Sequence, residues 1–143
     1  MFTGSALCVS WLENLMLGVH NHAVDGDVFK MALYTNEASI DTNTSVYTTS
    51  GEASGSGYDA GGVELTNVAP EVAGGVAFAQ FANVVFPAVS VTARGAMIYN
   101  SSKGNKAVAV LDFGSDKTFT ATDMPVTMPL FTNTAALLRI SAA

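Results

Sequence analysis

The sequence predicts one mainly β domain: an antiparallel β-sandwich or barrel of jelly-roll or immunoglobulin-like type, with a short N-terminal helix and a long Ser/Thr/Gly-rich loop. Short apolar segments with period-two alternation are separated by turn residues, which is typical of antiparallel strands. No amphipathic helix of roughly 10 to 15 residues alternates with them, which excludes a doubly wound α/β sheet. The 143 residues suffice for a single domain, 1–143, and are too few for two.

Residues 5–19 are predicted to form the helix. Apolar side chains recur there every four positions, at Leu7, Trp11, Leu15 and Val19. Ser5 can serve as the N-cap, and Gly18 provides a stop. We expect the apolar face, above all Trp11 and Leu15, either to pack on the domain's own sheet or to insert into a neighbouring subunit.

The strands begin at Val28, where the apolar period changes from about four to two. Phe29, Met31 and Leu33 then share one face of a strand over residues 28–35. Later segments rich in Val, Ile, Thr, Phe and Tyr are predicted to form further strands. These segments are residues 63–68, 76–86, 89–100, 105–113, 117–122, 124–128 and 136–141.

Turn signals separate these strands. Residues 101–105 (Ser-Ser-Lys-Gly-Asn) are predicted to form a hairpin loop, and residues 114–116 (Gly-Ser-Asp) another. Pro87 has no backbone N–H to donate, so we expect it to separate two long strands. Residues 25–27 (Asp-Gly-Asp) resemble the opening of a calcium loop but lack its other ligands, and a tight turn explains them better.

The stretch 35–62 differs in composition from the rest of the chain. It is rich in Ser, Thr, Gly and Asn, contains no Lys or Arg, and has few large apolar side chains. A connection of this length is rarely without a role in a compact domain. Two interpretations stay open: a mobile surface loop with one short strand, or an extended arm that orders against a neighbouring subunit and buries Tyr47 and Tyr58 there.

Composition restricts the partners. The net charge is −6 with only six Lys and Arg, so a nucleic-acid backbone would be repelled and nucleic acid is excluded as a partner. Charged residues make up only 13% of the chain and hydrophobic ones 49%, which favours association into a homo-oligomer or with another protein. No run approaches the roughly twenty apolar residues that a membrane-spanning helix needs, so we expect no membrane partner.

The motifs that resemble chemical sites are incomplete. His20 and His22 form a His-x-His pair without a third ligand at a recognisable spacing, so we expect capping or surface roles. Residues 55–60 match a dinucleotide fingerprint as a string, but no strand precedes them and no helix follows. Cys8 lies inside the predicted apolar helix, as buried structural thiols do. The sequence therefore predicts no enzyme and no catalytic, metal-binding or cofactor-binding residues.

Five segments of the chain form one set: 28–35 (VFKMALYT), 45–52 (SVYTTSGE), 55–62 (GSGYDAGG), 93–100 (ARGAMIYN) and 107–114 (AVAVLDFG). This set resembles a family of small virion proteins encoded by tailed bacteriophages. The resemblance covers nearly the whole chain and implies a structural place in the phage particle. It also implies synthesis in the bacterial host cytoplasm and localisation to the virion.

Together, composition and resemblance predict a non-enzymatic virion protein, above all a capsid decoration or cement protein that contacts the major capsid protein or other virion proteins. A neck, tail or baseplate component and a fibre-borne receptor-binding module are the alternatives. We expect Trp11, Leu15, Tyr47 and Tyr58 to contact partners. Arg94, isolated in an apolar strand, joins these candidates and is predicted to pair with an acidic group such as Asp112.

Overall fold

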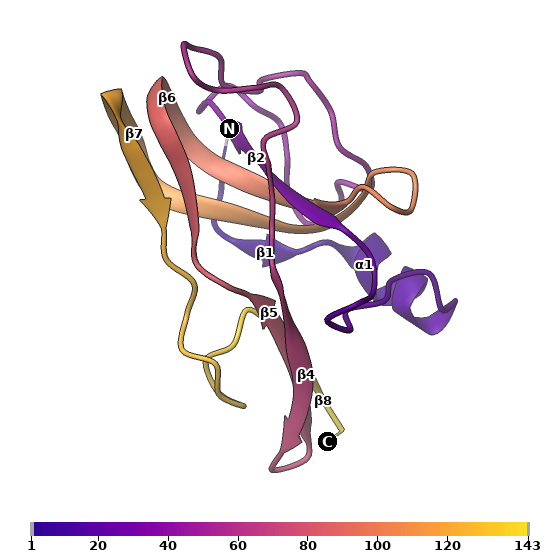
Figure 1. Cartoon of the computed structure of the whole chain (residues 1–143). Helices are drawn as coiled ribbons and strands as arrows, with labels where there is room; N and C mark the ends of the chain where they lie inside the picture. The colour runs from indigo at the N-terminus through magenta and orange to yellow at the C-terminus, as the bar shows by residue number, and fades with distance from the viewer. Residues whose placement is uncertain (1, 143) are drawn as a thin grey trace.

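The structure is a computed structural model that describes residues 2–142. Within that range the chain is mainly β with one short helix near its N-terminus, as the sequence predicts (Figure 1). The elements, in chain order, are β1 (Ala6–Leu7), α1 (Val9–Met16), β2 (Phe29–Tyr34), β3 (Val63–Glu64), β4 (Asn67–Ala73), β5 (Val76–Phe81), β6 (Val84–Asn100), β7 (Lys106–Val126) and β8 (Leu138–Ser141).

The strands form two open antiparallel sheets in a sandwich-like arrangement and not a closed barrel. The larger sheet has the order β1-β7-β6-β2-β3, and the smaller one has the order β4-β5-β8. Strand β5 leads after two residues into β6 and so connects the sheets (Figure 1). Phe29 of β2 and Phe81 of β5 bring their ring centroids within 5.3 Å, which places one continuous core across both sheets.

The long hairpin of β6 and β7 is the centre of the larger sheet. Residues 101–105 form its loop, as the sequence predicts. The predictions of a second loop at 114–116 and of a strand break at Pro87 are wrong, because both segments lie inside continuous strands as irregularities of the ladder. Between the pairs Ala93–Lys117 and Gly95–Asp112, one residue of β6 faces residues 113–116 of β7. Turn-forming residues here make a bulge, for which Gly114 supplies a φ of 84°.

Strand β2 is buried on both faces, although its alternation suggested one buried face. The segment 35–62 accounts for the difference, because its backbone bonds to the sheet. The Ala53 N–H donates to the Leu33 carbonyl at 2.8 Å, and the Ser90 N–H of β6 donates to the Ser56 carbonyl at 2.8 Å. The segment 35–62 is therefore packed against the larger sheet of its own chain.

The helix is shorter than predicted, and its first turn is replaced by a strand. Ala6 and Leu7 pair with β7 as β1, and the Ser5 hydroxyl accepts a hydrogen bond from the Asp112 N–H at 2.8 Å, so Ser5 is not the N-cap. Cys8 takes that position without a side-chain bond. The predicted stop is confirmed, since Gly18 follows the C-cap with a φ of 70°. No helix among residues 2–142 has the length and apolar character needed to cross a bilayer.

Candidate interaction surfaces

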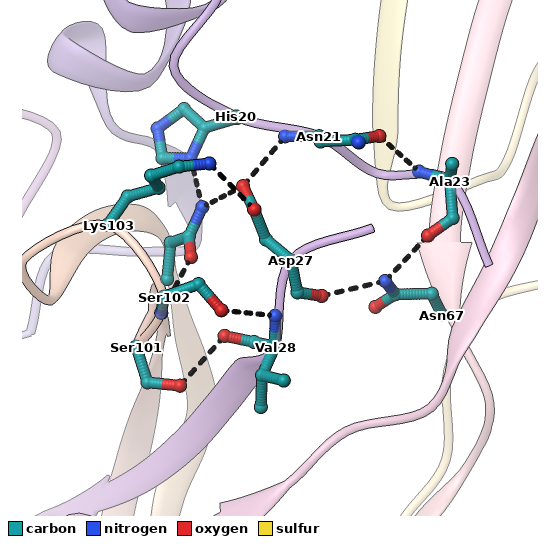
Figure 2. A network of polar contacts seen from close by, with 10 residues as sticks. His20, Asn21, Ala23, Asp27, Val28, Asn67, Ser101, Ser102 and Lys103 are labelled. Carbon is teal, nitrogen blue, oxygen red and sulfur yellow. Dashed lines mark hydrogen bonds and ion pairs between the residues drawn. The ribbon is translucent and has the colours of Figure 1, made fainter. Parts of the chain in front are cut away.

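Asp27 is the centre of a polar cluster that joins the turn after α1 to the β6–β7 loop (Figure 2). Its carboxylate accepts hydrogen bonds from the Asn21 N–H at 2.9 Å, the Asn100 side-chain amide at 2.8 Å and the Lys103 ammonium at 2.8 Å. Burial alone would raise the pKa of Asp27, but these three donors outweigh it and lower that pKa. The carboxylate makes all these bonds within the chain and so connects the turn after α1 to the β6–β7 loop.

The same cluster explains the predicted turn at residues 25–27, which is confirmed. The Asn67 side-chain amide donates to the carbonyls of Ala23 and Asp27, both at 2.9 Å (Figure 2). The Val28 N–H donates to the Ser102 hydroxyl at 2.8 Å. The turn is thus held by residues distant in sequence, and none of these bonds requires calcium.

His20 is buried and His22 is partly buried against aromatic side chains, so the predicted surface or capping roles are wrong. His22 stacks on Phe29 with 4.5 Å between ring centroids, and its Nε2 accepts a hydrogen bond from the Trp11 indole at 3.1 Å. Burial, with a smaller contribution from His20, lowers the pKa of His22 to about 4. His20 accepts a bond from the Asn100 amide at 3.0 Å. Among residues 2–142, no group of three His, Cys, Asp or Glu could hold a metal ion.

The lone thiol is equally enclosed. Cys8 has no exposed surface, and burial, helped by the charge of Asp41, raises the pKa of its thiol to about 12. A thiol with this pKa carries almost no thiolate at neutral pH. Cys8 is therefore a structural residue, as the sequence predicts.

Tyr47 and Tyr58 meet at a residue that the sequence did not single out, Glu52. The Glu52 carboxylate accepts hydrogen bonds from the Tyr47 hydroxyl at 2.5 Å, the Tyr58 hydroxyl at 2.7 Å and the Gly61 N–H at 2.7 Å. Burial and the bond to Glu52 raise the pKa of both tyrosines. Both hydroxyls are thus engaged within the chain, and this geometry gives no support to their anchoring a neighbour.

Two further contacts attach this cluster to the larger sheet. The Tyr47 ring stacks on Tyr99 of β6 with 4.7 Å between centroids, and the Tyr58 hydroxyl also accepts a bond from the Leu33 N–H of β2 at 2.9 Å. The segment 35–62 is therefore pinned to β2 and β6 by its own side chains.

The predicted partner of Arg94 is confirmed. The Arg94 Nε donates to Asp112 Oδ1 at 2.9 Å, and this bond is the main cause of the lowered pKa of Asp112. The same carboxylate oxygen accepts from the Gly114 N–H at 2.8 Å. The pair therefore braces the bulge of β7.

Trp11 and Leu15 face the chain's own core. Trp11 is only 2% exposed, and Leu15 is half-buried against the same core. The outer face of α1, together with the C-cap Leu17, carries apolar side chains as well: Leu12 is 42%, Met16 90% and Leu17 67% exposed. In the sequence Leu12 and Met16 widen the apolar stripe of this helix, and the structure adds that this part of the stripe reaches solvent.

An apolar groove of about 560 Å³ lies along the C-terminal half of β7. The side chains that form it include Leu111, Phe113, Phe119, Met124, Val126 and Leu137. Lys117 is the one charged residue that lines it. Within the described chain β1 pairs with β7 only at Ala109 and Val110, which leaves the strand's outer edge next to the groove without a neighbouring strand.

A second depression, of about 310 Å³, continues the groove. The two share Ser5, Leu111, Pro129 and Leu137, and the second adds Arg139. No protein-family model, curated protein or solved structure matches this chain. The groove and the outer face of α1 are the candidate sites that the geometry of the chain offers.

Proposed function

We propose that this chain is a non-enzymatic structural subunit of a tailed-bacteriophage particle and acts as a capsid decoration or cement protein. The observation that carries the proposal is apolar surface open to solvent in two places, the outer face of α1 and the groove along β7. Soluble monomers rarely leave such surface uncovered, whereas subunits of assemblies bury it in their contacts.

The five segments of the resemblance support the same proposal. Three of them, 28–35, 93–100 and 107–114, supply the paired parts of β2, β6 and β7 at the centre of the larger sheet. The other two, 45–52 and 55–62, supply the tyrosines around Glu52 and most of the cover of that sheet. The resemblance therefore concerns the residues that hold this fold together.

The proposed role is mechanical. A rigid β-domain that lies across the joints of capsid subunits adds interface area to the closed shell and stabilises it by mass action. The major capsid protein is the proposed partner of the assembled copies, and the exposed apolar surfaces are proposed to be covered by contacts within that assembly. The charged and polar clusters around Asp27 and Glu52 keep the domain rigid under load.

Copy number in purified particles tests this proposal. Quantitative mass spectrometry against the major capsid protein should give a ratio near one or one third, as expected for a component with a fixed place on the shell. A ratio of a few per cent would instead place the chain in the neck, tail, baseplate or fibres. Absence from particles would overturn the virion proposal itself.

A further inference from the structure

The two uncovered apolar surfaces are complementary in shape class: one is a helix face and the other is a groove. The outer face of α1 and its C-cap present Leu12, Met16 and Leu17, and the unbranched, flexible Met16 suits an irregular apolar hollow. The groove offers aromatic and aliphatic walls, such as Phe113, Phe119 and Met124, next to an unpaired strand edge. Helices commonly bind by laying an apolar face into a groove of this type.

Their charges are opposite. Glu13, which is exposed, is the only charged residue of α1. Lys117 lines the groove, Arg139 lines its continuation, and no acidic residue lines either depression. The two ion pairs found among residues 2–142 use Arg94 and Lys103, so neither Lys117 nor Arg139 is in one. In a chain with twelve acidic and six basic residues, two cations along an apolar groove favour a partner with an acidic apolar helix.

The two surfaces lie apart on the molecule. Figure 1 shows α1 on one side and the C-terminal half of β7 on the other. A chain cannot place its own helix in its own groove in this arrangement, but one copy can offer its helix while accepting the helix of another. Contacts of this head-to-tail kind generate closed rings or open chains of subunits.

We propose that the groove along β7 receives the outer face of α1 from a second copy of this chain, with Glu13 of one copy beside Lys117 of the other. The inference deepens the proposed function, on which it rests, by naming the contact through which copies assemble. Copies joined in this way form a head-to-tail array in which every subunit except the terminal ones uses both surfaces.

Two blocked variants separate the surfaces. The helix-blocked variant carries Met16→Glu and Leu17→Glu, and the groove-blocked variant carries Lys117→Glu and Thr127→Glu. All four positions are exposed, so the fold should be preserved. The control variant is Val72→Glu, which replaces an apolar residue that is 77% exposed on β4 and lines neither depression.

Sedimentation velocity over a concentration series gives the readout. The wild type and the Val72→Glu control should associate, and each blocked variant alone should stay monomeric, with its dissociation constant raised on the order of tenfold or more. A mixture of the two blocked variants should form a one-to-one dimer that does not grow, because it contains one intact helix face and one intact groove.

The charges give a second readout. Glu13→Lys should weaken association, and adding Lys117→Glu to it should restore association. A wild type that stays monomeric at every concentration overturns the inference, as do blocked variants that associate like the wild type. A mixture that stays monomeric also overturns it, because an intact helix face and an intact groove would then not bind each other. Particle copy number tests the proposed function independently, so the two can fail separately.

Discussion

The loop 35–62 and helix α1 are held on the domain in the opposite way to what their compositions suggest. The loop is polar and rich in Gly and Ser, yet Glu52 and the tyrosines around it hold it on β2 and β6. The helix is apolar, yet it buries only Trp11 fully and leaves Met16 90% exposed. A few well-placed hydrogen bonds can thus fix a segment that composition describes as mobile, whereas hydrophobicity alone does not determine which face of a short helix is covered.

The largest effect on the loop should come from Glu52→Ala. This change removes the acceptor of three hydrogen bonds and leaves two partly buried tyrosine hydroxyls without it. Urea unfolding should show a loss of about 2 to 4 kcal/mol. Glu52→Gln retains one acceptor oxygen of similar shape and should lose clearly less. Equal losses in both variants would mean that packing, and not the carboxylate, holds the loop.

Acid should weaken the anchoring of α1 nearly as strongly, through His22. Its pKa is about 4 in the folded chain against an ordinary value of 6.5, so the unfolded chain binds the proton first as the pH falls. The free energy of unfolding is therefore at its full value above about pH 6.5 and falls towards pH 4. The loss amounts to about 2 to 3 kcal/mol by pH 4.5.

Chemical unfolding measured from pH 7.5 to pH 4.5 should follow this decline. The lowered pKa of His20 acts in the same direction over this range, whereas the lowered pKa of Asp27 takes effect only below its ordinary value of 3.8. In His22→Gln, which cannot titrate, the slope between pH 6.5 and pH 4.5 should flatten. An unchanged slope in this variant would assign the acid sensitivity to other groups.

Removing the hydroxyl of either tyrosine should have a smaller effect on the free energy of unfolding, and the effect should be larger for Tyr58 than for Tyr47. Tyr58→Phe leaves the Leu33 N–H without its acceptor as well as removing a bond to Glu52, whereas Tyr47→Phe removes a bond to Glu52 and leaves no N–H of β2 without its acceptor. The expected losses in unfolding free energy are about 2 kcal/mol for Tyr58→Phe and about 1 kcal/mol for Tyr47→Phe. The reverse order would contradict the placement of Tyr58 as the bridge between the loop and β2.

The smallest effect on stability should come from the outer face of α1. Met16→Ser removes an apolar side chain that makes little contact within the chain, so the free energy of unfolding should change by no more than about 0.5 kcal/mol. Its self-association should nevertheless fall, as sedimentation would show. A large loss of stability would mean that Met16 supports the fold and is not a contact surface.

The β framework could be predicted because its causes are local. Alternating side chains indicated β2, and the Ser-Ser-Lys-Gly-Asn sequence indicated the loop between β6 and β7. Residues 114–116 misled because the same small, turn-forming residues also suit a bulge, and only the pairing opposite Arg94 decides between the two. The extent of β7 therefore depends on its partner strand.

The sites were predicted unevenly for a related reason. Arg94 stands alone in an apolar strand, and the need to neutralise it indicated Asp112. Glu52 has no such local sign, because its partners come from separate parts of the loop. Trp11 and Leu15 form an apolar stripe, but in a helix of eight residues a neighbouring stripe of Leu12 and Met16 is almost equally apolar. Which one faces the core is decided by β7 and the packed histidines.

Hydrogen exchange, followed by mass spectrometry in the monomer and in the associated state, tests most directly whether α1, and not the loop, is the contact surface. Amides of 35–62 that bond to the sheet, such as that of Ala53, should already be protected in the monomer. Added protection on association should be confined to α1 and to residues 117–126 of β7. Fast exchange throughout 35–62 in the monomer, followed by protection there on association, would contradict both expectations.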